Sequence, residues 1–235
     1  MIPFLQTDDA FPPATAARQD MGGLLAIGAD LSPQRILSAY LAGIFPWGTY
    51  EGHPLWYCPD PRMVLFPKEI RITRSLLKTL RRGDYEVRLD SDFAGVISRC
   101  AATPRPGQDG TWITPDMKAA YQKLHELGWA HSVETWVDGE LVGGLYGLAI
   151  GGMFYGESMF SHRTDASKIA FAHLARHLQQ EGFGMIDCQM HTDHLASLGA
   201  REIAVAEFLE RLATLTAMPR PAQAWARTAA SGSWS

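Results

Sequence analysis

A short apolar segment, Met185-Ile186-Asp187-Cys188-Gln189-Met190, follows a long helical pattern and a glycine-containing turn. It predicts a strand that is entered from a helix. Successive side chains of a strand point to opposite faces, so Ile186, Cys188 and Met190 share one face while Asp187 and Gln189 share the other. An acid beside an amide is costly to bury unless both are hydrogen-bonded. The pair is therefore either a structural device that fixes strand register or part of a functional site.

The rest of the chain predicts alternating helices and strands. Strands are expected at 85–89, 131–137, 140–149 and 153–160, with an extended piece near Ile203. Helices are expected at 33–42, 75–82, 91–101, 114–128, 165–181 and 193–198, and finally through Phe208 and Leu212, with caps at Ser32, Ser91 and Thr114. The aromatic and proline-rich segments 43–48 and 56–62 predict rigid loops. From residue 85 the order β-α-α-β-β-β-α-β-α-β matches an acetyltransferase-like fold, which by itself assigns no function.

Composition bounds the class of protein. The 235 residues are 46% hydrophobic and carry a net charge of −4, so a general polyanion binder is excluded and any nucleic-acid contact needs a local basic patch. The three cysteines form no CxxC pair and predict reduced thiols. With no signal peptide evident and no apolar run near the roughly 18 residues of a membrane span, we expect a cytoplasmic protein. The tail 219–235, rich in Ala, Ser and Pro, is predicted to be disordered.

One local basic patch is present. Helical spacing places Arg74, Lys78, Arg81 and Arg82 on one side of the segment before Gly83. Such a patch is either a solvated helix face or a surface that contacts phosphates.

A second acid interrupts a strand at Glu157, in Gly156-Glu157-Ser158-Met159-Phe160. If this strand neighbours the opening one, both carboxylates and Gln189 could line one cavity with apolar walls. The alternative is an ordinary core with one satisfied glutamate.

Other chemistries find little support. Cys188, His191, Asp193 and His194 have a spacing that a metal could use, but no second ligand pair accompanies them. No nucleophile elbow, P-loop or dinucleotide fingerprint is present. The turn 161–166 contains no glycine, which argues against ordinary acetyl-coenzyme A chemistry.

Taken together, five motifs resemble those of the bacterial leucyl/phenylalanyl-tRNA–protein transferases, in order and with similar gaps from about Gly22 to Phe208. They are Gly43-Ile44-Phe45-Pro46-Trp47, Pro59-Asp60-Pro61-Arg62, Gly110-Thr111-Trp112-Ile113-Thr114, Gly156-Glu157-Ser158-Met159-Phe160-Ser161 and Ile186-Asp187-Cys188-Gln189. Tyr57 stands where a second Trp is usual, and Leu145 where a Met is common.

The resemblance implies an α+β fold with a small N-terminal domain (1–62) and a larger acetyltransferase-like (GNAT-like) mixed-sheet domain (63–218). It implies transfer of Leu or Phe, less readily Met, from aminoacyl-tRNA to the N-terminal Arg or Lys of a protein, which marks that protein for degradation. No cofactor or metal is expected, because the tRNA ester is already activated. We expect a monomer.

The resemblance also assigns residues. Asp187 and Gln189 are the expected catalytic pair, facing the reactive ester at the mouth of the cleft. The terminal adenosine is expected near Tyr40, Trp47, Trp112, Glu157 and Ser161, and the amino-acid side chain within walls formed by Leu145, Phe154, Met159, Phe171, Leu174 and Ile186. The basic patch is expected to contact tRNA phosphates near the acceptor stem. Two alternatives stay open: a transferase of the same fold that uses coenzyme A, and a non-enzymatic module that binds tRNA acceptor ends.

Overall fold

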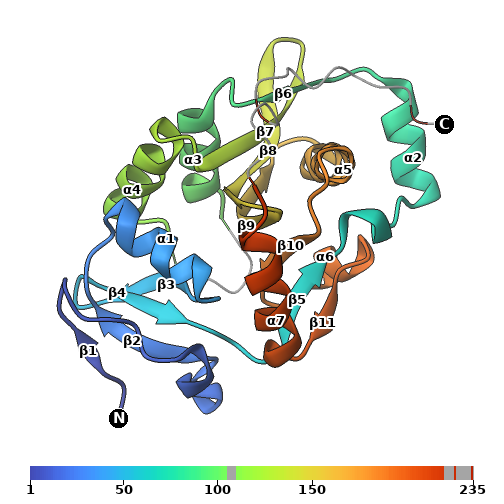
Figure 1. Cartoon of the computed structure of the whole chain (residues 1–235). Coiled ribbons are helices and arrows are strands. Elements are labelled where there is room, and N and C mark those ends of the chain that lie inside the picture. The colour runs from blue at the N-terminus through green and yellow to red at the C-terminus, as the bar shows by residue number, and fades with distance from the viewer. Residues whose placement is uncertain (105–109, 220–224, 226–233, 235) are drawn as a thin grey trace.

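The chain forms an α+β structure built on two β-sheets (Figure 1). The computed structural model describes residues 1–104, 110–219, 225 and 234. Strands of the smaller sheet come from the first 57 residues, and those of the larger sheet begin at Arg62. The predicted α+β class is confirmed.

The smaller sheet has the strand order β1-β2-β4-β3. Its strands are β1 (Phe4–Leu5), β2 (Leu24–Gly28), β3 (Phe45–Tyr50) and β4 (His53–Tyr57). The prediction of rigid loops at 43–48 and 56–62 was therefore wrong for most of these residues. Prolines at 46 and 54 hide the strand pattern, and the ladder accommodates Pro46 at a register shift between Pro46 and Thr49. Trp56 is fully buried and donates a hydrogen bond to the Gly28 carbonyl oxygen at 2.8 Å.

The larger sheet has the strand order β11-β5-β10-β9-β8-β7-β6. Its strands are β5 (Arg62–Leu65), β6 (Glu86–Leu89), β7 (Ala130–Val137), β8 (Glu140–Ile150), β9 (Met153–Ser161), β10 (Met185–Gln189) and β11 (Arg201–Ile203). β10 pairs parallel with β9, and the other neighbouring strands are antiparallel. The sheet is mixed, as predicted, and the element order from β6 onward is the predicted one.

The helices begin and end within a few residues of their predicted bounds. They are α1 (Pro33–Leu41), α2 (Arg74–Arg82), α3 (Phe93–Ala102), α4 (Pro115–Glu126), α5 (Ala166–Gln180), α6 (Asp193–Ser197) and α7 (Val205–Thr216), with 3-10 turns at Ala14–Ala16, Gln19–Met21 and Pro67–Glu69. Ser32 and Thr114 cap α1 and α4 as expected. The cap of α3 is Asp92 and not Ser91, because the Ser91 hydroxyl donates to Glu134 instead.

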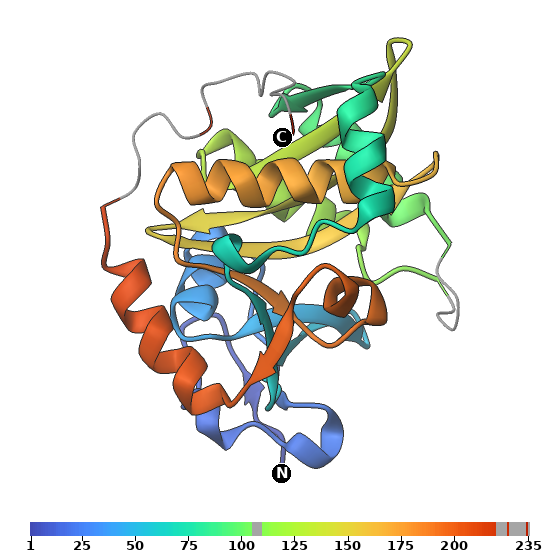
Figure 2. The ribbon, with the colours of Figure 1, turned by 90° about the vertical axis from the view of Figure 1, so that its right-hand side faces the viewer.

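Helices cover both faces of the larger sheet. Two adjacent glycines of β8 allow this close packing, because a Cβ added to Gly143 would lie 2.4 Å from Ala166 of α5, and one added to Gly144 would lie 3.5 Å from Val96 of α3. Successive strand residues face opposite sides, so α5 and α3 lie on opposite faces. Figure 2 shows α5 lying lengthwise across its face of the sheet.

One apolar core is shared by the two sheets. It includes Leu25 and Trp56 of the smaller sheet together with Val64 and Tyr155 of the larger one. The predicted division of the chain into a small domain (1–62) and a larger domain (63–218) stays a prediction.

The predicted disorder of 219–235 falls mainly on residues outside the described part of the chain. Within that part, Trp225 and Trp234 pack against the apolar cluster on the α5 side. Cys58, Cys100 and Cys188 are free thiols, as predicted. Among the described residues, no helix is long and apolar enough to cross a membrane.

Candidate active site

A cleft opens where β9 and β10 separate. Their parallel pairing ends at Asp187 and Tyr155, after which β9 continues beside β8. β10 stays paired with β5, where Gln189 pairs with Met63 after a register shift that follows Asp187. A cavity of about 500 Å³ lies at this point, lined by residues of both diverging strands. The conditional prediction that the strands of Glu157 and Asp187 are neighbours is confirmed.

The interior of the cavity is apolar. All six residues predicted for its walls line it: Leu145, Phe154, Met159, Phe171, Leu174 and Ile186. Leu145, Phe154, Leu174 and Ile186 are at most 2% exposed, whereas Met159 is only partly buried. The structure thus brings the wall residues together from β8, β9, α5 and β10.

Two tryptophans lie at the rim. Trp47 of β3 and Trp112, which precedes α4, line the cavity and also a neighbouring hollow of about 400 Å³ that includes Tyr57 and Thr111. The Trp47 and Tyr57 rings meet edge to face with their centroids 5.5 Å apart. The rim therefore offers aromatic faces at the junction of two hollows.

Glu157 forms the polar end of the cavity. Its Oε1 accepts hydrogen bonds from the Tyr40 hydroxyl at 2.6 Å and from Gln189 Nε2 at 3.1 Å, and its Oε2 accepts one from the Tyr121 hydroxyl at 2.8 Å. Glu157 is 8% exposed, and burial raises its pKa from 4.5 to about 7, against the lowering effect of the two tyrosine hydrogen bonds. A carboxyl group with this pKa exchanges a proton near neutral pH.

The tyrosines support Glu157 from behind. Tyr40 and Tyr121 are fully buried, and their hydroxyl groups lie 2.6 Å apart. Burial, together with the charge of Glu157, raises the pKa of both phenols, so they remain hydrogen-bond donors. Tyr40 was expected beside the adenosine, but it reaches the cavity only through Glu157. Sequence reasoning missed Tyr121, which lies on the buried side of α4 with Met117 and Leu124 and gives no polar signal of its own.

Ser161 is not brought to the cavity. It is exposed at the end of β9, where its hydroxyl donates to the Arg163 carbonyl oxygen at 2.8 Å and accepts from the Ser167 N–H at 3.3 Å. These contacts fix the entry into α5. This placement does not support the predicted contact of Ser161 with adenosine.

Asp187 is sealed inside the protein. It is 0% exposed, and its two oxygens accept hydrogen bonds from Arg62 Nε at 2.8 Å and Nη2 at 2.6 Å. Its Oδ1 also accepts from the backbone N–H of Gln189 at 2.9 Å. The expectation that this carboxylate faces the mouth of the cleft was wrong, because a buried arginine is its partner. Its predicted membership of a catalytic pair is not tested by this placement.

Gln189 does face the cavity, but its backbone conformation and not strand alternation places it there. Its φ is +63°, a left-handed conformation that non-glycine residues seldom adopt. With the register shift before it, this places Gln189 in the lining alongside Ile186 and Cys188. The side chain is held at Glu157, and the backbone is held at Asp187.

Sequence reasoning missed Arg62, although one of the five motifs ends on it. The guanidinium is 0% exposed and lies between two rings, with Cζ 4.7 Å from the centroid of Phe45 and 4.6 Å from that of Phe208. Burial favours loss of its proton, but the charge and hydrogen bonds of Asp187 outweigh burial and raise the pKa of Arg62. The signal that could have found it is a lone arginine leading into the apolar run Met63-Val64-Leu65, where only a paired charge is tolerated.

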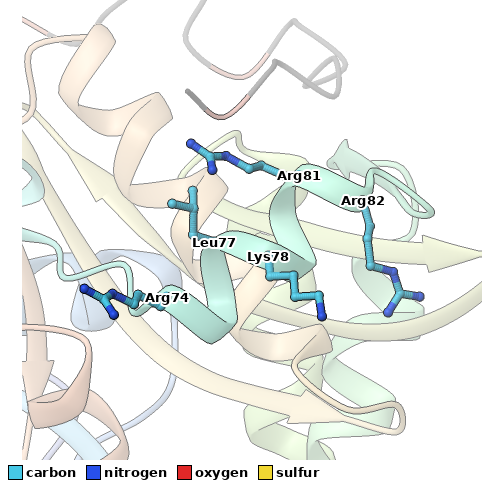
Figure 3. Close-up of a pocket in the computed structure, with 5 residues that line it drawn as sticks. All are labelled: Arg74, Leu77, Lys78, Arg81 and Arg82. Atoms are coloured by element: carbon cyan, nitrogen blue, oxygen red, sulfur yellow. The ribbon is translucent and has the colours of Figure 1, made fainter.

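The predicted basic patch lies on α2, away from the cleft lining. Arg74, Lys78, Arg81 and Arg82 line one shallow hollow of about 440 Å³ together with Leu77 (Figure 3). Lys78 and Arg82 extend in the same direction, whereas Arg81 turns away (Figure 3). The four cations are exposed, but Arg82 pairs with Asp84 and Arg81 Nε donates to the Trp234 carbonyl oxygen at 3.1 Å.

The metal site considered from the cysteine and histidine spacing is not assembled. Among the described residues, no group of three or more His, Cys, Asp or Glu side chains is placed to hold a metal ion. Cys188 lines the cavity, but burial raises the pKa of its thiol, so the thiol stays protonated and is a poor nucleophile or ligand.

Comparison with known families assigns the chain. The family model of the leucyl/phenylalanyl-tRNA protein transferase matches residues 64–213, and the model of the N-terminal domain of the same transferase matches residues 29–60. These models define an enzyme of the aminoacyl-transferring class. The chain belongs to the leucyl/phenylalanyl-tRNA protein transferase family, as its motifs predicted.

Curated relatives extend this similarity over nearly the full length. A leucyl/phenylalanyl-tRNA--protein transferase of Dechloromonas aromatica (strain RCB) is 69% identical over 225 residues, which are 96% of each chain. Those of Chromobacterium violaceum and Nitrosomonas europaea are 59% and 57% identical, over 96% of this chain and 96% and 95% of theirs.

Solved structures are similar only at a coarse level. The structure of L-PGS from Bacillus licheniformis has a TM-score of 0.38 and 14% identity, covering 82% of this chain and 66% of that one. A GCN5-related N-acetyltransferase from Kribbella flavida has a TM-score of 0.38 and 12% identity, covering 73% and 61%.

Proposed function

We propose that this protein transfers leucine or phenylalanine, and less readily methionine, from aminoacyl-tRNA to the N-terminal Arg or Lys of an acceptor protein. The observation that carries this proposal is a cavity of about 500 Å³ whose apolar interior ends at a carboxylate and an amide, Glu157 and Gln189, within hydrogen-bond distance of each other. The enzyme acts as a monomer in the cytoplasm, where charged tRNA is available.

The walls of the cavity suit unbranched or γ-branched apolar side chains. Apolar pockets separate substrates that differ by one methylene by only about 1–3 kcal/mol, so Leu, Phe and Met can all enter. Met159 and Phe171 add adaptable and aromatic surface to the wall. A β-branched residue is disfavoured because its second Cβ substituent falls beside the polar end, at Glu157 and Gln189, and not in the apolar interior.

The terminal adenosine lies at the rim. Trp47 and Trp112 line both the cavity and the adjoining hollow, so a base stacked on them leaves the esterified amino acid pointing inward. Base–aromatic stacking contributes about 1–3 kcal/mol per base without requiring base-specific hydrogen bonds.

The reaction requires positioning and the net movement of one proton from the amine to the ribose oxygen. The acceptor amine attacks the ester carbonyl carbon, a C–N bond forms, the ester C–O bond breaks, and the ribose oxygen leaves as a hydroxyl once it has taken up the proton that the amine loses. Holding the amine against the carbonyl can supply on the order of 7–11 kcal/mol of the barrier. Gln189 orients the reacting groups through its amide, which the Glu157 carboxylate fixes.

Glu157 is the proton acceptor in this scheme. Asp187 cannot meet the acceptor directly because it is sealed against Arg62, whereas Glu157 lines the cavity and has a pKa raised to about 7. The tyrosine hydroxyls hold its ionised form, and the departing ribose oxygen can receive the proton in turn. Asp187 contributes by fixing the backbone of Gln189.

The tRNA body contacts the exposed cations of α2. Arg74 and Lys78 are exposed, and phosphate contacts by such side chains give affinity that depends on salt and little on sequence.

The test is transfer of labelled leucine from charged tRNA to a protein beginning with arginine. We expect transfer by the native enzyme, none with acetyl-coenzyme A as donor, and a large loss in Gln189→Ala. Arg201→Ala, in an exposed ion pair with Glu69, is the control and should transfer normally. Binding of charged tRNA without any transfer would instead favour a non-enzymatic acceptor-end module.

A further inference from the structure

Trp225 packs against the larger sheet through defined ring contacts, although it lies far along the C-terminal tail. Its ring stacks on His131 of β7, with centroids 4.2 Å apart and planes 6° apart. It also lies 5.7 Å from the ring of Phe154 of β9 and 5.3 Å from that of His177 of α5. Three elements thus hold one tail residue, and the polar rings on two of them suit an indole better than a purely aliphatic side chain.

One of these neighbours belongs to the cavity. Phe154 is fully buried, lines the cavity and lies opposite Ile186 in the parallel pairing of β9 with β10. Its ring is closely confined, because a Cβ added to Gly147 would lie 2.6 Å from it. Trp225 is stacked on it at an interplanar angle of 30°. The position of the Phe154 ring therefore depends on the Trp225 ring that is stacked on it, and the depth of the apolar interior depends on the position of Phe154.

We propose that Trp225 is a positioning residue for the aminoacyl side-chain pocket. Acting through Phe154, it sets the depth of the pocket and so the preference between leucine and the longer phenylalanine. The inference rests on the proposed function, since it concerns the same cavity. A tail residue can have this role because protein interiors are tightly packed, so that removing one large side chain shifts the side chains that adjoin it.

The tail supplies its own matched control. Trp234 also packs on α5, with its ring 5.2 Å from that of His173 and its indole N–H donating to His173 Nε2 at 3.2 Å. The Arg176 guanidinium lies over the same ring, with Cζ 5.1 Å from its centroid. These partners belong to α5 and not to the cavity wall, so Trp234→Ala removes a tail tryptophan of the same kind without taking a stacking partner from Phe154.

The experiment compares Trp225→Ala, Trp225→Phe and Trp234→Ala. Transfer is measured as kcat/KM with leucyl-tRNA and with phenylalanyl-tRNA, and affinity is measured for amide-linked leucyl and phenylalanyl adenosine and for plain adenosine. In Trp225→Ala we expect the Phe-to-Leu ratio to rise about 5-fold or more, a change within the range of small apolar pocket differences. Trp225→Phe should restore most of the native ratio, and plain adenosine should bind as before.

Two results would overturn the inference: a native Phe-to-Leu ratio in Trp225→Ala, or an equal change of ratio in Trp234→Ala. If Trp225→Ala does not fold, Trp225→Leu, which keeps apolar volume, decides by the same ratio. Failure of the proposed function is distinct, because the native enzyme would then transfer neither amino acid and bind neither amide, which would refute both proposals.

Discussion

Replacing Asp187 by Asn should test whether this residue positions Gln189 or takes part in the chemistry. The change keeps the shape of the side chain but leaves Arg62 buried without an opposite charge. Both side chains are 0% exposed, and removing one partner of such a pair costs about 3–5 kcal/mol. For a chain of this size that corresponds to a fall in Tm of roughly 6–20 °C, at about 2–4 °C per kcal/mol.

The assay pairs thermal unfolding with single-turnover transfer at saturating charged tRNA. If Asp187 acts by holding the Gln189 N–H, then Asp187→Asn should lose stability and transfer rate together. The double variant Arg62→Met with Asp187→Leu replaces the ion pair by apolar volume, and such replacements are often neutral or stabilising. We therefore expect the double variant to regain stability but not the rate, because nothing fixes the φ of +63° at Gln189.

The control is Glu69→Gln, which makes the same kind of neutralisation in an exposed pair with Arg201. Its cost should stay below about 1 kcal/mol. An unchanged Tm in Asp187→Asn together with an abolished transfer rate would refute the positioning role. It would indicate that the Asp187 carboxylate takes part in the reaction itself. Recovery of the rate in the double variant would refute the claim that the Asp187 carboxylate holds Gln189.

Three further predictions concern the carboxylate, the wall and the basic patch. The folded protein binds a proton at Glu157 more tightly than the unfolded chain does, so stability should fall as pH rises from 4.5 through about 7, by about 3.5 kcal/mol in all at ~1.4 kcal/mol per pH unit. Denaturant unfolding at pH 5 and 8.5 should show most of this fall in the native protein and not in Glu157→Gln. Met159→Ala should weaken selection of leucine over valine by several-fold in transfer assays, and an unaltered preference would remove Met159 from the selecting wall. Arg74→Ala with Lys78→Ala should weaken tRNA binding and lower the slope of log affinity against log salt concentration by about 0.7–0.9 for each phosphate that these cations no longer neutralise. Arg82→Ala should change this slope less, because Asp84 already pairs with Arg82. Equal slopes in all variants would mean that the patch is only a solvated helix face.

Much of the fold could be predicted because its signals are local. Ser32 and Thr114 cap helices through contacts within three residues, and Gly83 ends α2 in the left-handed conformation that glycine favours. The turn at Asp138 and Gly139 joins β7 to β8 as its sequence indicates. By contrast, β3 and β4 of the smaller sheet were missed because prolines and aromatics obscure their period, and the pairing of β2 depends on partners about 20 to 30 residues away.

The candidate site, like the fold, was predicted from the sequence only in part. The apolar wall residues could be grouped from the sequence, because the family resemblance assigns all six of them. The polar end was predicted only in part, since its geometry depends on long-range partners. Arg62 lies 125 positions from Asp187, and Tyr40 lies 117 positions from Glu157. No local pattern says that such residues will meet, and none says that a burial cost at Asp187 is offset by an arginine.

One departure of β10 from its neighbour accounts for both the cleft and the residue at its end. The pairing of β10 with β9 ends at Asp187, whereas its pairing with β5 continues to Gln189 through a register shift that follows Asp187, and a space opens between the two parallel strands. The Arg62–Asp187 pair joins β5 to β10 at that shift, and the carboxylate also binds the Gln189 N–H. Gln189 can therefore point into the cavity only if the shift is maintained, and we expect the Arg62–Asp187 pair, which lies outside the cavity lining, to stabilise the shift. A buried ion pair is weak evidence for stability, and in some proteins such a group fixes one arrangement of the chain among several; we infer that this pair fixes the register here. We therefore expect the charge at Asp187 to be required for the shape of this cleft, and variants of Arg62 to impair transfer although Arg62 lies outside the cavity.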